Sequence, residues 1–299
     1  MKVQIIGGGA VGLLVASYLQ QGGLQVTIVV RNEEQCESLN RNGLTRIGFN
    51  EEELTIPVTA TTQLQGDARL TIVTTKSYQL TSLLSRLQKL PTDMALLFMQ
   101  NGLAHFEPAL QLPQQHIGFA SVQFGAVRDS LTSVSHKGIG LFKLAVAKGD
   151  KRHFEVLEAV ASEKFPVLFE EKAYDMLFEK ALLNCFVNPM TAILQVKNGV
   201  LIQNPAAYKL LKQLYDELKL AFPREMEKFP FEAVVSLCEK TALNTSSMLM
   251  DMKCGRQSEV DAIVRPIIEK AERAGHLLPS LSTLYYLVNA LEMERDRQK

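Results

Sequence analysis

The stretch that decides the fold of this chain is Gly7-Gly8-Gly9-Ala10-Val11-Gly12. The apolar run Val3–Ile6 before it predicts a strand, and the proline-free run Val11–Leu19 after it has helical spacing. A G-x-G-x-x-G pattern alone is common by chance, but between a strand and a helix it is typical of dinucleotide binding. Its glycines permit a tight turn, close approach of a pyrophosphate and close helix packing. We therefore predict that residues 7–12 hold cofactor phosphates at a helix N-terminus.

The N-terminus also has a competing interpretation as a signal peptide, because Met1-Lys2 is followed by a long apolar stretch. That interpretation fits poorly, since only one lysine precedes the apolar run and no small-x-small cleavage site follows it. A second strand is predicted over Gln25–Val30, after Gly22-Gly23. It completes a β-α-β unit, which favours the nucleotide site.

The end of this second strand indicates which dinucleotide is bound. An NAD site usually carries Asp or Glu about 20 residues past the loop, to hold the ribose hydroxyls. This chain has Arg31-Asn32 there. A guanidinium cannot accept a hydrogen bond from a hydroxyl, but its planar fork suits a 2′-phosphate. The alternative is a solvated surface arginine; the sequence favours NADP(H).

Length and composition exclude several classes of protein. The chain has 299 residues, 46% of them hydrophobic, which is enough for two domains. Its 32 basic and 32 acidic residues give no bulk field for nucleic acid or an acidic membrane. No later apolar run is long enough to span a bilayer. The scattered cysteines and histidines predict reduced thiols, a cytoplasmic location and no metal site.

The first half alternates between strand and helix patterns. Beyond Arg31 we expect strands at 44–47, 54–58, 70–75 and 94–99, with helices at 33–41 and 80–90. The β-rich runs 117–127 and 139–147 are expected to close the sheet in a parallel or antiparallel sense. A helix over about 151–164 and a strand at 165–169 would finish the domain.

Three residues in this half are placed where a parallel sheet binds ligands, beyond the carboxyl ends of its strands. Lys76 follows one predicted strand, and Asn101, in Gln100-Asn101-Gly102, follows the next. Ala126 lies near the end of a later run and is small enough for close cofactor approach. The alternatives are an ordinary strand-end lysine and a simple Asn-Gly turn.

After about residue 170 helical patterns replace strands, so we predict domains over 1–170 and 171–299. The helix predicted from Ala173 to about Leu194 carries Lys180, Asn184 and Asn188 at i, i+4 and i+8, on one face. The rest of the segment is strongly apolar. The stripe could simply face water, but burying it would require partners. Pro189, which costs about 3 kcal/mol inside a helix, also favours a site here.

A second polar constellation extends over residues 244–261. Gly255 is expected to end a helix, and Ser258 with Asp261 to cap the next one partially. Ser247 and Asp251 share a face of the preceding helix. Glu259 has an alternative interpretation as an acid favoured near a helix N-terminus.

Together these motifs closely resemble the ketopantoate reductase family. The resemblance rests on the glycine loop, Lys76, Gln100-Asn101-Gly102, Lys180-x3-Asn184-x3-Asn188-Pro189-Met190-Thr191-Ala192 and Ser246-Ser247-Met248-Leu249-x-Asp251-x4-Arg256-x2-Glu259-x-Asp261. It extends from residue 1 to about 275, and the two later motifs are far more specific than the glycine loop. One departure is Ser280-Leu281-Ser282 after Pro279, where many members have an asparagine. This departure leaves substrate specificity more open than the reaction.

The resemblance implies an α/β protein with a Rossmann-type dinucleotide-binding domain followed by an all-helical domain, and an active site in the cleft. It implies NADPH-dependent reduction of 2-dehydropantoate to (R)-pantoate, for pantothenate and coenzyme A synthesis. Lys180 would be the general acid, with Glu259 holding it protonated or contacting the cofactor.

The resemblance also implies which residues bind the ligands. Asn184, Asn188 and Ser247 would hydrogen-bond the substrate, with Asn198 a weaker candidate. Asn101 would touch both substrate and nicotinamide, and Lys76 would serve the cofactor or the substrate carboxylate. Two other functions stay open: reduction of another branched 2-oxo acid, and non-catalytic NADP(H) sensing. The oligomeric state is also open, with a homodimer as one alternative.

Overall fold

The structure, a computed structural model, describes residues 1–298 and divides into two compact units. The first consists of Met1–Gln100 and His105–Leu177. The second consists of Asn101–Ala104 and the chain from Phe178 onward. The sequence places a boundary near residue 170, whereas the contacts divide the chain inside a helix, between Leu177 and Phe178. They also assign the short segment after Gln100 to the second unit.

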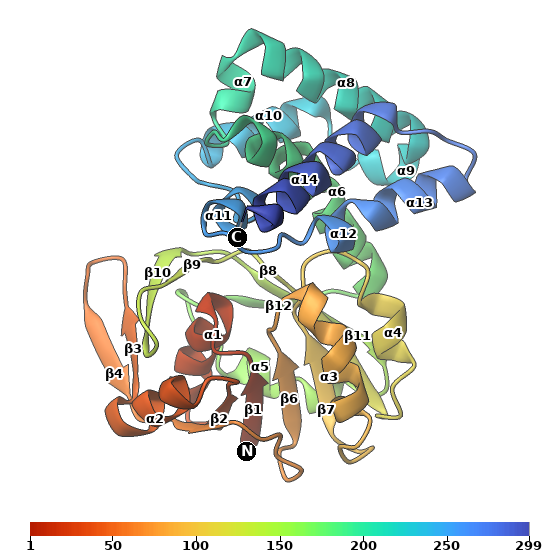
Figure 1. Ribbon diagram of the computed structural model, residues 1–299. Coiled ribbons are helices and arrows are strands. Elements are labelled where there is room, and N and C mark those ends of the chain that lie inside the picture. The colour runs from red at the N-terminus through yellow and green to blue at the C-terminus, as the bar shows by residue number, and fades with distance from the viewer. Residues whose placement is uncertain (299) are drawn as a thin grey trace. The chain divides into compact units, whose positions relative to one another are not determined.

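The first unit is built on an eight-stranded sheet with the order β12-β11-β8-β7-β6-β1-β2-β5. The strands are β1 (Lys2–Ile6), β2 (Gln25–Val29), β5 (Thr59–Thr61), β6 (Leu70–Val73), β7 (Ala95–Phe98), β8 (His116–Val122), β11 (Phe142–Lys148) and β12 (Val167–Phe169). Neighbouring strands are parallel except for β8 and β11. In Figure 1, β1 lies between β2 and β6. From β1 the chain first adds β2 and β5 on one side of the sheet and then β6, β7 and β8 on the other. Sheets with such a reversal of strand order bind ligands beyond the carboxyl ends of their strands.

A second, four-stranded sheet corrects part of the predicted strand order. It has the order β4-β3-β10-β9 and comprises β3 (Leu44–Ile47), β4 (Glu53–Ile56), β9 (Gly125–Arg128) and β10 (Ser133–Gly138). The run 117–127 is therefore two strands in two sheets, and the polar stretch after it contains a strand. Alternation of apolar residues cannot show which sheet a strand joins, since that depends on distant pairing such as Val134 beside Arg46.

The helices of the first unit follow the predicted pattern with two exceptions: the short helix Phe106–Leu110 is not among those predicted, and the predicted helix over 151–164 does not form. The helices are α1 (Ala10–Gln21), α2 (Glu33–Asn42), α3 (Leu80–Leu87), α4 (Phe106–Leu110) and α5 (Val156–Ala159), with 3-10 turns at Ser77–Gln79 and Lys151–His153. The expected helix over 151–164 is wrong. Only short helical turns form there, because Asp150 caps the first turn through its bond to the Arg152 N–H and the backbone then closes a Ser162–Phe165 bridge.

The second unit is helical, as predicted. Its helices are the later part of α6 (Ala173–Leu194), then α7 (Val200–Gln203), α8 (Pro205–Ala221), α9 (Pro223–Met226), α10 (Phe231–Lys240), α11 (Ser247–Lys253), α12 (Val260–Ile263), α13 (Arg265–Arg273) and α14 (Pro279–Arg297). Local chemistry sets their ends: Asn204 accepts the Ala206 and Ala207 N–H groups ahead of Pro205 at the start of α8. Within residues 1–298, no helix is long and apolar enough to cross a membrane.

Candidate functional site

The glycine loop has the geometry expected of a phosphate cradle. Gly7 has φ of +121°, which side chains rarely adopt, and a Cβ on Gly12 would lie 2.0 Å from the Gly7 carbonyl oxygen. A Cβ on Gly9, in contrast, would have no heavy atom within 4 Å. Gly7 and Gly12 are therefore required by the protein's own packing. The space beside Gly9 is open for a ligand at the start of α1, the helix that carries Ala10 and Val11.

Three side chains outside the glycine motif fix this loop in place. Thr74 Oγ1 lies 3.0 Å from the Ile6 oxygen and 3.1 Å from the Gly7 oxygen. Gln35 Nε2 donates to the Gly8 oxygen at 2.9 Å, and Arg128 Nη1 donates to the same oxygen at 3.3 Å. Arg128 lies in β9, two residues from Ala126, so the second sheet contributes to the loop. A sequence pattern could not show this, because Arg128 is 120 residues from Gly8.

Arg31 lies just past β2 and is exposed. It makes no hydrogen bond or ion pair to another residue within 1–298, so its guanidinium is free for a phosphate. Asn32, beside it, is occupied as the cap of α2, accepting the Gln35 N–H at 3.0 Å. Lys76 is half-buried just past β6. Gln100, just past β7, is buried and donates to the backbone oxygens of Val73 and Thr75 at the end of β6.

The polar stripe of α6 is where the sequence predicts it, within the second unit. Lys180 and Asn184 are half-buried, and Asn188 is 5% exposed. Within the described chain, neither asparagine side chain hydrogen-bonds to another residue. A largely buried amide such as that of Asn188 is costly unless a ligand or water satisfies it. The solvated-face interpretation of the stripe is therefore wrong for Asn188, and the helix presents unused hydrogen-bonding groups.

Lys180 and Glu259 are brought together, although 79 positions separate them in the sequence. Burial lowers the pKa of the Lys180 ammonium from its ordinary value to about 8, and the negative charge of Glu259 opposes that shift. Glu259 is only 5% exposed, and its Oε2 accepts a hydrogen bond from Asn101 Nδ2 at 3.1 Å. The neighbouring acid on α6, Glu179, instead pairs with Lys228. Glu259 is thus more than an acid at a helix start.

Asn101 is held against the Glu259 helix by the backbone. The Leu103 N–H donates to the Ala262 oxygen at 2.8 Å, which joins the segment Asn101–Ala104 to α12. Gly102 makes this possible, because its φ is +81° and a Cβ there would lie 2.0 Å from the Ala262 oxygen. The backbone therefore bends at Asn101-Gly102, and this bend brings the Asn101 amide within hydrogen-bonding distance of the Glu259 carboxylate.

The two specific motifs of the second half are also joined. Thr191 on α6 and Ser246 share a buried hydrogen bond of 2.7 Å, and Ser246 caps α11 by accepting the Leu249 N–H. Ser247 is the next residue and is exposed. Asn198 is buried; its Nδ2 donates to Thr241 Oγ1 at 3.0 Å, while its Oδ1 accepts no hydrogen bond within the described residues.

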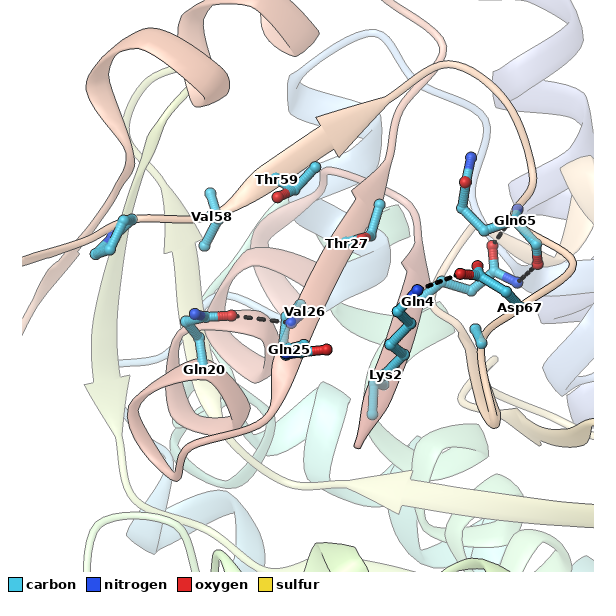
Figure 2. Close-up of a pocket in the computed structure, with 13 residues that line it drawn as sticks. Lys2, Gln4, Gln20, Gln25, Val26, Thr27, Val58, Thr59, Gln65 and Asp67 are labelled. Carbon is cyan, nitrogen blue, oxygen red and sulfur yellow. Dashed lines mark hydrogen bonds and ion pairs between the residues drawn. The ribbon is translucent and has the colours of Figure 1, made fainter.

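Two hollows in the first unit contain none of these residues. One, of about 520 Å³, lies at the amino ends of β1, β2 and β5, the edge opposite the glycine loop. Figure 2 shows its polar side chains bonded to the protein: Lys2 to Asp67, Gln4 to Gln65, and Gln20 to Val26. The other, of about 580 Å³, lies beside Arg46 and the end of α1. The first hollow leaves few groups for a ligand, so we place the chemistry at the residues above.

Comparison with known proteins gives matches over both halves. The family model Ketopantoate reductase PanE/ApbA matches residues 3–149, and Ketopantoate reductase PanE/ApbA C terminal matches residues 173–292. The 2-dehydropantoate 2-reductase of Bacillus subtilis (strain 168) is 36% identical over 302 residues, covering 99% of each chain. That of Pyrococcus horikoshii is 30% identical, covering 98% of each chain.

Solved structures match over the same length. The crystal structure of the probable 2-dehydropantoate 2-reductase from Bacillus subtilis has a TM-score of 0.86 at 34% identity, covering 98% of this chain and 100% of that one. D-mandelate dehydrogenase with NADH and anilino(oxo)acetate has a TM-score of 0.87 at 24% identity, covering 99% of both chains. The second likeness shows the shared fold. The predicted fold class, a Rossmann-type domain followed by a helical domain, is confirmed.

Proposed function

Because this chain belongs to the ketopantoate reductase family, we propose that it reduces the ketone of 2-dehydropantoate with NADPH, giving (R)-pantoate. The observation that carries the proposal is the grouping of Lys180, Glu259 and Asn101. It combines a proton donor whose pKa is lowered toward neutrality, a carboxylate that keeps the donor charged, and an amide that orients the carboxylate. Lys180 and Glu259 are proposed as the catalytic residues.

The cofactor is proposed to bind the first unit. The open space at Gly9, the N–H groups at the start of α1 and Arg31, which has no partner among residues 1–298, fit a pyrophosphate and a 2′-phosphate. Lys76 and Ala126 are further proposed contacts. NADPH, when bound, supplies the hydride, and the protein's residues do the rest of the work.

The substrate is proposed to bind the helical unit. The unpartnered amides of Asn184 and Asn188, the exposed Ser247 hydroxyl and the buried Asn198 oxygen match the carboxylate, ketone and hydroxyl groups of a hydroxylated 2-oxo acid. When the carbonyl carbon gains a hydride, its oxygen takes a proton from the Lys180 ammonium. The neutral amine then regains a proton from water. Glu259 favours the charged form of Lys180, so more of the enzyme carries the proton at neutral pH.

The direct test is loss of NADPH absorbance on addition of 2-dehydropantoate, with NADH and a panel of branched 2-oxo acids in parallel. We expect the highest kcat/KM with NADPH and 2-dehydropantoate. Faster turnover of another 2-oxo acid would identify that acid as the substrate and leave the reaction, NADPH-dependent reduction of a 2-oxo acid, unchanged. Binding of NADPH without turnover of any member of the panel would contradict the enzyme and leave the NADP(H) sensor.

The pH profile gives a second prediction. Since the acid must be protonated, kcat should fall as pH rises through about 8, the pKa of Lys180. Glu259→Gln removes the charge that raises this pKa, so the alkaline limb should move down by about one pH unit. The exposed Glu272→Gln on α13 is the control and should leave the limb in place. A Glu259→Gln profile that coincides with the wild type would show that Glu259 does not tune Lys180.

A further inference from the structure

Glu259 lies at the end of a loop that the last helix of the chain holds. This loop, residues 254–259, connects α11 to α12. The first contact that holds it comes from Asp251 on α11. The carboxylate oxygen Oδ1 of Asp251 accepts from Arg256 Nε at 2.9 Å, and its backbone carbonyl oxygen accepts the Arg256 backbone N–H at 2.8 Å. This contact fixes how the chain leaves α11, but it does not reach Glu259.

The second contact comes from α14, more than 30 positions later. Glu292 Oε1 accepts the Ser258 N–H at 2.7 Å, immediately before Glu259. Arg295, one turn further along α14, donates from Nη1 to the Arg256 oxygen at 2.6 Å. Two side chains on adjacent turns of α14 therefore hold the loop backbone: Glu292 accepts from the Ser258 N–H, and Arg295 donates to the Arg256 carbonyl oxygen.

The Glu292 carboxylate is buried and has the Ser258 N–H as its hydrogen-bond donor. The residue is 7% exposed, and within residues 1–298 no basic group lies within 4 Å of its carboxylate. A buried carboxylate without a cation is costly unless its hydrogen bonds compensate. Its bond to the Ser258 N–H is charge-assisted and short, so the backbone just before Glu259 is held firmly.

We propose that Glu292 and Arg295 are positioning residues that hold the Glu259 carboxylate in reach of Lys180 and Asn101. The assignment rests on the proposed function of Glu259. Both residues act through the loop backbone, without touching the reacting groups. Glu259 is the charged group that raises the pKa of Lys180 against the effect of burial. Two other acids, Glu179 on α6 and Asp251 on α11, bind Lys228 and Arg256. Glu259 is therefore the charge whose displacement Lys180 would register.

The test is Glu292→Ala, compared with Glu292→Gln and with Glu294→Ala, an exposed residue on the same helix. Alanine leaves the Ser258 N–H without an acceptor, whereas glutamine keeps one. We expect Glu292→Ala to lower kcat by about tenfold and move the alkaline limb down by up to about one pH unit. Glu292→Gln should recover most of both, and Glu294→Ala should match the wild type.

A purely structural role predicts a different outcome: Glu292→Ala would lower the melting temperature while its alkaline limb stays at the wild-type pH, which would overturn the proposal. If Glu292→Ala does not fold, Arg295→Ala, which removes the other contact, should show the same direction of shift. An unshifted limb there would equally overturn it.

A readout without turnover separates this proposal from the proposed function. The pKa of Lys180 can be followed from the 13C shift of its Cε in lysine-labelled protein, assigned with Lys180→Ala. A lower Lys180 pKa in Glu292→Ala would support the positioning role even if 2-dehydropantoate is not turned over. An unchanged pKa would contradict the positioning role even in an active enzyme.

Discussion

Lys180→Ala should lower kcat for 2-dehydropantoate reduction by about 10²- to 10⁴-fold, the usual contribution of a general acid. The alkoxide formed by hydride transfer would then have to take its proton from water. NADPH binding, measured by fluorescence titration, should stay near the wild-type value, since the proposed phosphate contacts, Gly9 and Arg31, belong to the other unit.

Two companion variants sharpen this measurement. Lys180→Arg keeps the positive charge, but a guanidinium does not release its proton near neutral pH. It should be nearly as slow as alanine and should lose the alkaline limb at about pH 8. Lys209→Ala, an exposed lysine on α8, should behave as the wild type. A Lys180→Ala enzyme with unimpaired kcat would rule out Lys180 as the acid while leaving the reaction intact.

Gly102→Ala should destabilise the protein by about 3 kcal/mol. A side chain at φ of +81° costs about 1–2 kcal/mol, and displacing a packed backbone adds about 1–3 kcal/mol. The displaced atom would be the Ala262 oxygen, so the Leu103–Ala262 bond and the Asn101–Glu259 contact should weaken together. We therefore expect a loss of kcat beyond the loss of stability.

Gly275→Ala is the matched control for this variant. Gly275 also has φ of +81°, but a Cβ there would have no heavy atom within 4 Å. It carries the conformational strain without the collision, so urea unfolding should show a loss of about 1 kcal/mol and unchanged kcat. Equal losses of stability in the two variants would show that the close approach to Ala262 is unimportant.

The sequence could predict features set by neighbouring residues. Short, continuous runs of apolar and β-branched residues indicated β1, β2, β6 and β7, which are typical of buried parallel strands. Helical spacing of apolar residues indicated α1 and α6, because the 3.6-residue period follows directly from backbone geometry. The spacing of Lys180, Asn184 and Asn188 placed them on one face of α6 for the same reason. Resemblance to a family supplied their roles, and these roles stay predictions.

Only the tertiary structure decided which distant residues meet. β3 pairs with β4, and β9 with β10, between residues close in the sequence, but the pairs join into one separate sheet through β3 and β10, where Thr45 lies beside Ser133, 88 positions away. Hydrophobic alternation does not encode that distant pairing. The helix expected at 151–164 failed because a side-chain cap and a bridge competed with a modest helical pattern. The meeting of Asn101 with Glu259, the tuning of Lys180 by Glu259 and the hold of Glu292 on Ser258 join residues 34 to 158 positions apart. Such contacts form because a buried polar group is stable only with a hydrogen-bonding partner. The order of residues along the chain does not determine which distant residue becomes that partner.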